Sequence, residues 1–164
     1  LSVMPANGRI VNTSSGAHRS GEIDFDTFRS TDGYSGWSAY CQSKLANILF
    51  TRELDRRADG IVANAFHPGF VPGSAFMRQI PAPIRIPVRA ARYLPGVGTS
   101  VEEGASTAVY LAAAPDLNSS GQYFTKHSPK RPTEQAQDDR LAERLWERSE
   151  RLTDLDETLR LDAS

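Results

Sequence analysis

A short apolar run, a long helical pattern and a second apolar run, in that order, set the strongest limit on how this chain can fold. The first run, Arg9–Thr13, ends at small hydroxyl residues, and the second, Ile61–Phe66, follows the helix-stopping sequence Ala58-Asp-Gly60. Between the runs Ser38 is a predicted N-cap, and apolar residues recur at helical spacing at Leu45, Ile48, Leu49 and Leu54. A strand, helix and strand with short connections form a βαβ crossover. The sequence therefore predicts an α/β domain with parallel strands.

The rest of the chain adds two helices, one strand and two long loops. Polar residues broken by glycine and aspartate predict a loop over Gly16–Gly36 that covers the active site, and a proline-rich stretch predicts a second loop at 70–99. Ser100-Val-Glu-Glu103 is a capping-box pattern that begins a helix ending at Ala114. Gly121–Thr125 predicts a further strand. A charged helix is predicted at 133–155, with an apolar stripe made by Leu141, Leu145, Trp146 and Leu152.

Composition bounds the partners of this chain. Its 164 residues make one ordinary domain, and a formal net charge of -1 argues against nucleic acid. No apolar run approaches the roughly 20 residues that a transmembrane helix needs. The lone cysteine, Cys41, allows no internal disulfide, which favours a reducing, cytoplasmic setting. Cys41 is read as a buried inert residue, with a reactive thiol as the alternative.

One pair of residues carries chemistry. Tyr40-Cys-Gln-Ser-Lys44 places a phenol and an ammonium one helical turn apart on the same face, where side chains i and i+4 meet. A fixed cation beside a phenol favours the phenolate. The spacing therefore predicts that Tyr40 is an acid/base group assisted by Lys44.

Three segments in this order resemble the short-chain dehydrogenase/reductase family. They are the strand Gly8-Arg-Ile-Val-Asn-Thr-Ser-Ser15, the helix start Tyr40-Cys-Gln-Ser-Lys-Leu-Ala-Asn47 and the strand end Asn64-Ala-Phe-His-Pro-Gly69. The helix sequence, the long insert between Ser15 and Tyr40 and the late segment Arg144–Ser149 resemble the retinol-dehydrogenase-like branch. Light-dependent protochlorophyllide reductases are more distant relatives.

The resemblance implies the C-terminal part of a Rossmann-type doubly wound parallel sheet. The family's glycine-rich turn after the first strand does not occur in this sequence, and neither does its Asn-Asn-Ala-Gly segment. The chain also begins at Leu1 rather than at methionine. We therefore expect the first strands and the glycine-rich turn to be absent and the chain to be part of a longer protein.

The resemblance also implies site residues. Tyr40 would exchange a proton with the carbonyl or alcohol oxygen, Ser15 would hold that oxygen, and Lys44 would assist Tyr40 and bind the nicotinamide ribose. Cofactor contacts are implied for Tyr40, Lys44, Pro68, Gly69 and Val71. Ser74 is the nearest hydroxyl to the threonine that the family usually places after the valine, but its register is one residue out. The implied cofactor is NADP, with NAD as the alternative, because the residues that choose between them are not in this sequence.

The implied activity is interconversion of an apolar carbonyl compound and its alcohol, because apolar residues recur between Phe70 and Leu94. Two alternatives remain: a truncated non-catalytic module kept for dimerisation or ligand binding, and a pigment or lipid binder without turnover. A homo-oligomer is possible. The histidines His18, His67 and His127 lack metal-ligand spacing, so no metal is predicted. Four arginines form either an anion site or a solvated loop face: Arg78, Arg85, Arg89 and Arg92.

Overall fold

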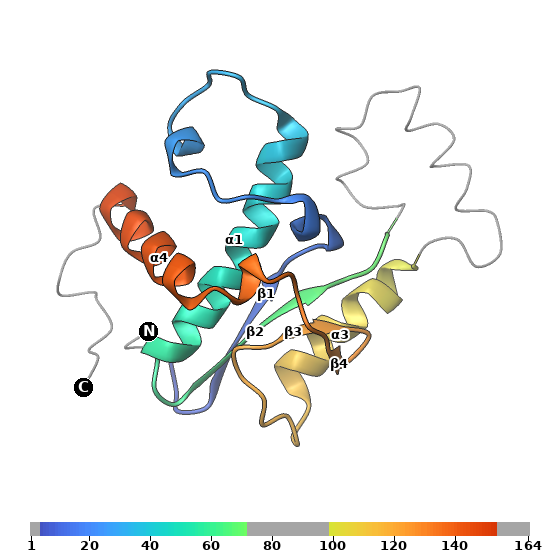
Figure 1. The fold of residues 1–164 in the computed structure, drawn as a ribbon. Coiled ribbons are helices and arrows are strands. Elements are labelled where there is room, and N and C mark those ends of the chain that lie inside the picture. The colour runs from blue at the N-terminus through green and yellow to red at the C-terminus, as the bar shows by residue number, and fades with distance from the viewer. Residues whose placement is uncertain (1–3, 72–98, 154–164) are drawn as a thin grey trace.

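The computed structural model describes residues 4–71 and 99–153, which form an α/β fold in three layers (Figure 1). The sheet order is β1 (Gly8–Thr13), β2 (Ile61–His67), β3 (Tyr123–Thr125) and β4 (Ser128–Pro129). The first three strands are parallel, and β4 is antiparallel to β3. Helices α1 (Gly36–Arg57) and α4 (Asp139–Thr153) cover one face, and α3 (Val101–Ala113) covers the other. The predicted α/β class is confirmed, and the sheet matches part of a Rossmann-type fold.

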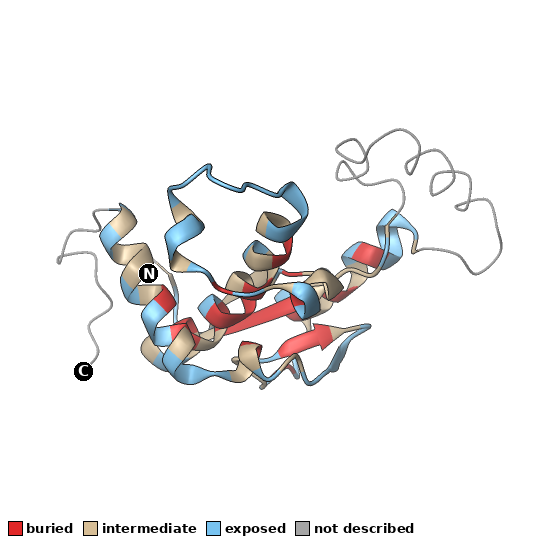
Figure 2. Cartoon of the chain, turned by 45° about the horizontal axis from the view of Figure 1, so that its top comes forward, coloured by how far each residue is buried: buried red, intermediate tan, exposed pale blue. Residues whose placement is uncertain are grey.

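Buried side chains alternate between the two faces of the sheet along each strand, and each face has its own hydrophobic core. Ala65 and Tyr123 are register partners whose side chains pack with Leu45 and Leu49 of α1, whereas the next pair, Phe66 and Phe124, packs on the α3 side. Side chains at successive strand positions point to opposite faces, so one sheet serves both layers. Figure 2 shows the buried residues gathered in the central strands and on the inner sides of the helices.

The crossover helix α1 begins earlier than the sequence suggests. Ser35, not Ser38, is the N-cap, because the Ser35 Oγ accepts a hydrogen bond from the Ser38 N–H at 3.4 Å. Ser38 is therefore already inside the first turn. Two serines three residues apart offered two possible caps, and the preceding glycine-containing turn admits the earlier one. The predicted end is confirmed, since Ala58 is the C-cap and Gly60 has φ +73°.

The segment between β1 and α1 is not a loop over the pocket along its whole length. It forms 3₁₀ helices at Gly16–Ser20 and Phe25–Phe28, and only its first residues line the pocket. Ile23, with the partly buried Phe25 and Phe28, packs into the core cluster that contains Leu45 of α1 and Leu145 of α4. The apolar residues inside this polar stretch explain the difference, because burying them offsets the cost of ordering the segment.

The later elements follow the sequence with one shift of boundary. Helix α3 is confirmed, with the Ser100 Oγ accepting from the Glu103 N–H at 3.0 Å. Strand β3 occupies the last three residues of the predicted Gly121–Thr125. Helix α4 begins at Asp139 rather than at residue 133, because Gln135–Gln137 forms a separate 3₁₀ helix before it. Residues 154 and 155 lie outside the described residues.

Several expectations fall on residues that the structure does not describe. Ser74, the four arginines between Arg78 and Arg92, and most of the loop predicted at 70–99 belong to this group. Among the helices of residues 4–71 and 99–153, none combines the length and apolar character that crossing a membrane requires.

Candidate active site

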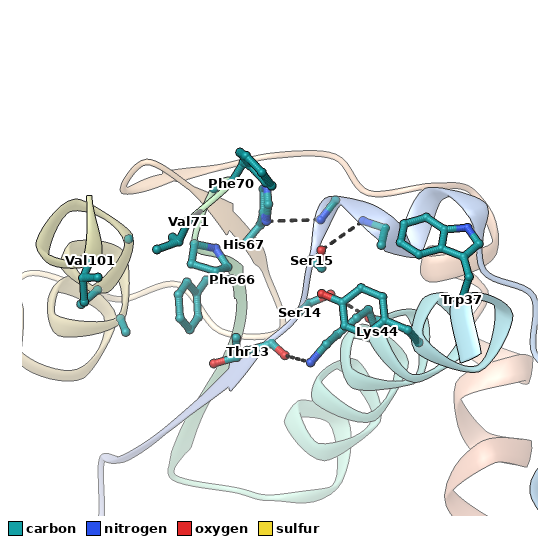
Figure 3. Close-up of a pocket in the computed structure, with 18 residues that line it drawn as sticks. Thr13, Ser14, Ser15, Trp37, Lys44, Phe66, His67, Phe70, Val71 and Val101 are labelled. Carbon is teal, nitrogen blue, oxygen red and sulfur yellow. Dashed lines mark hydrogen bonds between the residues drawn. The ribbon is translucent and has the colours of Figure 1, made fainter. Parts of the chain in front are cut away.

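A pocket of about 830 Å³ lies at the carboxyl ends of β1 and β2. Its walls come from four places: the residues after β1, the first turns of α1, the turn after β2 and the start of α3. The carboxyl edge of parallel strands is where open α/β sheets bind ligands. In Figure 3, Ser15 and Lys44 stand on one side of this pocket, and Val71 and Val101 stand on the other.

The pocket brings together every described residue that was predicted to act in catalysis or cofactor binding. Its lining includes Ser15, Tyr40, Lys44, Pro68, Gly69 and Val71. These residues come from three separate segments of the chain, so their meeting depends on the tertiary structure. The lining also contains residues that were not predicted from the sequence: Thr13, Trp37, Phe66, His67 and Val101. These residues lie at strand ends and at helix starts, and that position was the signal from which they could have been predicted. Phe70, the first of the apolar residues from which an apolar substrate was predicted, lines the pocket as well.

Lys44 is held between the strand and the phenol. Its Nζ donates a hydrogen bond to the Thr13 carbonyl oxygen at 3.3 Å and lies 5.6 Å from the centre of the Tyr40 ring (Figure 3). Partial burial of the ammonium lowers the pKa of Lys44, because removal from water disfavours the charged form. An ammonium has three N–H donors, and only the bond to Thr13 is made among the described residues. Lys44 can therefore donate further bonds to a molecule in the pocket.

Three contacts set the position of α1 against β1. The Ser14 Oγ donates to the Lys44 carbonyl at 2.7 Å, the Asn47 Nδ2 donates to the Thr13 carbonyl at 2.9 Å, and the Asn12 Nδ2 donates to the Thr51 Oγ1 at 2.9 Å. Residues 44, 47 and 51 lie on one face of the helix, since they are separated by three and four positions. We call this set of contacts the α1–β1 seam. It places Tyr40 and Lys44 beside the end of β1.

The two serines after β1 have different surroundings. Ser14 is 1% exposed, and its hydroxyl bonds to the backbone of α1. The Ser15 Oγ instead accepts a hydrogen bond from the Ala17 N–H at 3.2 Å, which caps the 3₁₀ helix Gly16–Ser20. A hydroxyl that accepts one bond can still donate its own proton. Ser15 therefore offers an O–H donor at the pocket wall, as the sequence reasoning expected of the second serine.

The turn after β2 brings the backbone close to the start of α3. Gly69 has φ +85°, and a Cβ at this position would lie 2.6 Å from the Thr99 Oγ1. A Cβ on Gly104 would lie 2.8 Å from the Val71 Cγ2. Both glycines are therefore required for close packing of the turn on α3. The Thr99 N–H donates to the Phe70 carbonyl at 2.7 Å. This backbone hydrogen bond joins the residues that precede segment 72–98 to those that follow it.

Two of the three histidines lie next to each other, although they are distant in sequence. His18 is 1% exposed, and its Nδ1 bonds to the Ser15 carbonyl at 2.6 Å. The His67 Nδ1 accepts a hydrogen bond from the Gly16 N–H at 3.2 Å. Burial lowers the pKa of His67, and the charge of His18 lowers it further. Within residues 4–71 and 99–153, no cluster of His, Cys, Asp and Glu has the arrangement of a metal site.

Cys41 lies on the helix beside Tyr40 but is fully buried. Burial raises the pKa of its thiol. A buried thiol with a raised pKa forms little thiolate, so it is a poor nucleophile. The interpretation of Cys41 as an inert core residue is confirmed.

The chain is similar to several proteins of known class. Retinol dehydrogenase 13 of Homo sapiens is 40% identical over 165 residues, which cover 92% of this chain and 47% of that protein. Dehydrogenase/reductase SDR family member 13 of Bos taurus is 38% identical over 157 residues, covering 92% of this chain and 41% of that protein. A solved structure of an uncharacterised protein from Mycobacterium Paratuberculosis has a TM-score of 0.63 at 30% identity, covering 90% of this chain and 51% of that one. No protein-family profile matches the chain.

These similarities confirm the resemblance to the short-chain dehydrogenase/reductase family, and the relatives are named as dehydrogenases. Within the family, it is similar to the retinol dehydrogenases. The chain spans about half the length of the curated relatives that it matches.

Proposed function

We propose that this chain supplies the proton-transfer site of an NAD(P)-dependent oxidoreductase that interconverts an apolar carbonyl compound and its alcohol. The observation that carries the proposal is the meeting of Tyr40, Lys44, Ser15 and the Pro68-Gly69 turn around one pocket at the carboxyl edge of the sheet. The proposed cofactor is NADP, with NAD as the alternative.

The residues present fit the nicotinamide end of such a cofactor. Lys44 is a partly buried ammonium with donors to spare, which suits ribose hydroxyls. The turn at Pro68, Gly69 and Val71 presents backbone groups to the same pocket. When bound, the nicotinamide supplies or takes the hydride.

The chain's own residues then handle the proton and the oxygen. In reduction, the carbonyl carbon gains a hydride and its oxygen gains the proton of the Tyr40 phenol; in oxidation, the Tyr40 phenolate takes the alcohol proton. The Ser15 O–H donates to the same oxygen and orients it. The Lys44 ammonium lies over the Tyr40 ring, where its positive charge offsets the negative charge that develops as the proton is transferred.

The pocket wall supports an apolar substrate. Trp37, Phe66, Phe70, Val71 and Val101 contribute large apolar side chains to it. Apolar walls with a few placed polar groups are typical of small-molecule pockets. The name of the relative retinol dehydrogenase 13 agrees with an alcohol of this kind. A panel of carbonyl compounds tested with the full-length protein should show a preference for long apolar aldehydes, and a preference for sugars or hydroxy acids would contradict the proposal.

Replacement of Tyr40 by phenylalanine in the full-length protein tests the mechanism. Tyr40→Phe removes the transferable proton and should lower kcat by about 10²–10⁴-fold. Binding of the cofactor, measured by calorimetry, should remain largely intact. A variant that keeps more than about a tenth of the parental kcat would show that the proton comes from another group.

The alternative function is a module for dimerisation, and one observation favours it. Among the described residues, β1 pairs with β2 alone, so its other edge has no strand partner. An unpaired edge is a template for another chain. Light scattering of the 164-residue chain should then show oligomers or aggregates, whereas a stable monomer that binds NADPH tightly would contradict this reading.

Because Cys41 is the lone cysteine, we also propose a cytoplasmic location.

A further inference from the structure

The peptide segment that carries Ser15 is attached to the neighbouring strand on both sides of this residue. On the N-terminal side, the Ser14 N–H donates to the Phe66 carbonyl at 2.7 Å. On the C-terminal side, the Gly16 N–H donates to the Nδ1 of the His67 side chain at 3.2 Å. The first bond extends the β1–β2 ladder, and the second replaces a backbone acceptor with an imidazole (Figure 3).

The imidazole can make this contact in one protonation state. An N–H donor requires a lone pair on Nδ1, so the ring must be neutral with its proton on Nε2. A doubly protonated ring has donors at both nitrogens and no acceptor. Protonation of His67 would therefore set two donors, Nδ1–H and Gly16 N–H, against each other.

The surroundings of His67 oppose its protonation. His18 is the nearby titratable group on the 3₁₀ helix, and its charge lowers the pKa of His67 in addition to the larger effect of burial. From α1, Lys44 and Tyr40 line the same pocket, and the pocket residues of α3 are apolar or glycine. Among the described lining residues there is no aspartate or glutamate that could stabilise an imidazolium.

We propose that His67 is a positioning residue: its neutral ring anchors the Gly16 N–H and so holds the Ser15 hydroxyl toward the pocket, and protonation of the ring releases that anchor. This inference deepens the proposed function and rests on it for the role of Ser15. His18 supports the same turn, since its ring Nδ1 bonds the Ser15 carbonyl at 2.6 Å and its backbone N–H donates to that carbonyl at 3.2 Å.

Two substitutions separate the hydrogen bond from the bulk of the ring. In His67→Asn, the amide oxygen occupies the branch position of Nδ1 and can accept from Gly16, but it does not titrate. In His67→Leu, the side chain remains large and has no acceptor. His127→Asn is the matched control, because His127 is an exposed histidine on the β3–β4 turn whose Nε2 contacts the Ser106 Oγ at 3.1 Å, outside the pocket lining.

Steady-state kinetics of the full-length protein provide the first readout. We expect His67→Leu to lower kcat by about 10- to 100-fold, since a small misplacement of an orienting group has effects of this order. His67→Asn should recover most of that loss. The wild type and His127→Asn should lose kcat on the acid side of the pH profile, and His67→Asn should lack this acid limb. Equal losses in the Leu and Asn variants, or an acid limb that survives in His67→Asn, would overturn the proposal.

Nuclear magnetic resonance provides a readout that does not depend on turnover. The amide shift of Gly16 should titrate together with the His67 ring in the wild type and should be flat in His67→Asn, with thermal unfolding showing that each variant is folded. A Gly16 amide that ignores the His67 titration would overturn the proposal. If this coupling is present but Tyr40→Phe keeps full activity, the proposed function fails while the anchoring contact stands.

Discussion

At the scale of single residues, Lys44 has surroundings that differ from those of an ordinary, solvated helix lysine. It is partly buried, bonds to the end of β1 and lies over the Tyr40 ring. We predict that Lys44→Ala weakens cofactor binding and lowers kcat, because the ammonium beside the Tyr40 ring and its spare donors are lost. Calorimetry with NADPH and steady-state kinetics are the measurements.

Lys44→Arg is the control for charge without the same geometry, since a guanidinium is a planar fork rather than a compact ammonium. It should retain more of the cofactor affinity than Lys44→Ala and restore the rate only in part. Unchanged affinity for NADPH in Lys44→Ala would show that this residue does not contact the cofactor.

At the scale of elements, the α1–β1 seam fixes the position of α1 relative to β1, and with it the position of the first turns of the helix at the pocket. Thr51 is 1% exposed and accepts the bond from the Asn12 amide. We predict that Thr51→Val, which keeps the shape and removes the hydroxyl, lowers the free energy of unfolding by about 1 kcal/mol, because the part-buried Asn12 amide loses its hydrogen-bond partner. Denaturant unfolding measures this loss. Thr107→Val, at a buried threonine of α3 on the other face of the sheet, is the matched control and should cost less.

At the scale of the whole molecule, the two adjacent histidines make stability depend on pH. Burial lowers the pKa of both His18 and His67 below the ordinary 6.5. The His18 Nε2 is buried without a hydrogen-bond partner in the described structure, so a proton there would be an unsatisfied donor. A depressed histidine pKa contributes stability that is present above the unfolded value and is lost as pH falls through the folded value.

We therefore predict that the melting temperature is constant on the alkaline side and falls as the pH drops below about 6.5. His18→Asn, which can keep a donor to the Ser15 carbonyl but does not titrate, should flatten part of this fall. His127→Asn should leave it unchanged, because His127 is exposed. A melting temperature that rises on acidification would contradict the assignment of neutral rings.

The class of fold and the residues that meet at the pocket were predicted from the sequence more securely than the boundaries of elements. The strands around Ile10 and Ala63, and the pairing of Tyr40 with Lys44, followed from local spacing. The N-cap was displaced from Ser38 to Ser35, and the segment 16–36 proved to pack against α1 and α4, because caps and buried loops depend on which neighbours are available. No local pattern marks Ile23 or Phe25 as core residues.

The amino-acid sequence by itself determined the βαβ order, the phenol and ammonium on one helical face, and the hydroxyl pair after the first strand, since each depends on neighbours within a few positions. The tertiary structure decided that the Ser14 hydroxyl is taken up by a bond to the Lys44 carbonyl of α1, although both serines line the pocket. It also decided that His18 and His67 meet around Ser15, although they are far apart in the chain. Parallel strands end at one edge of a sheet, and this geometry turns separate motifs into one site.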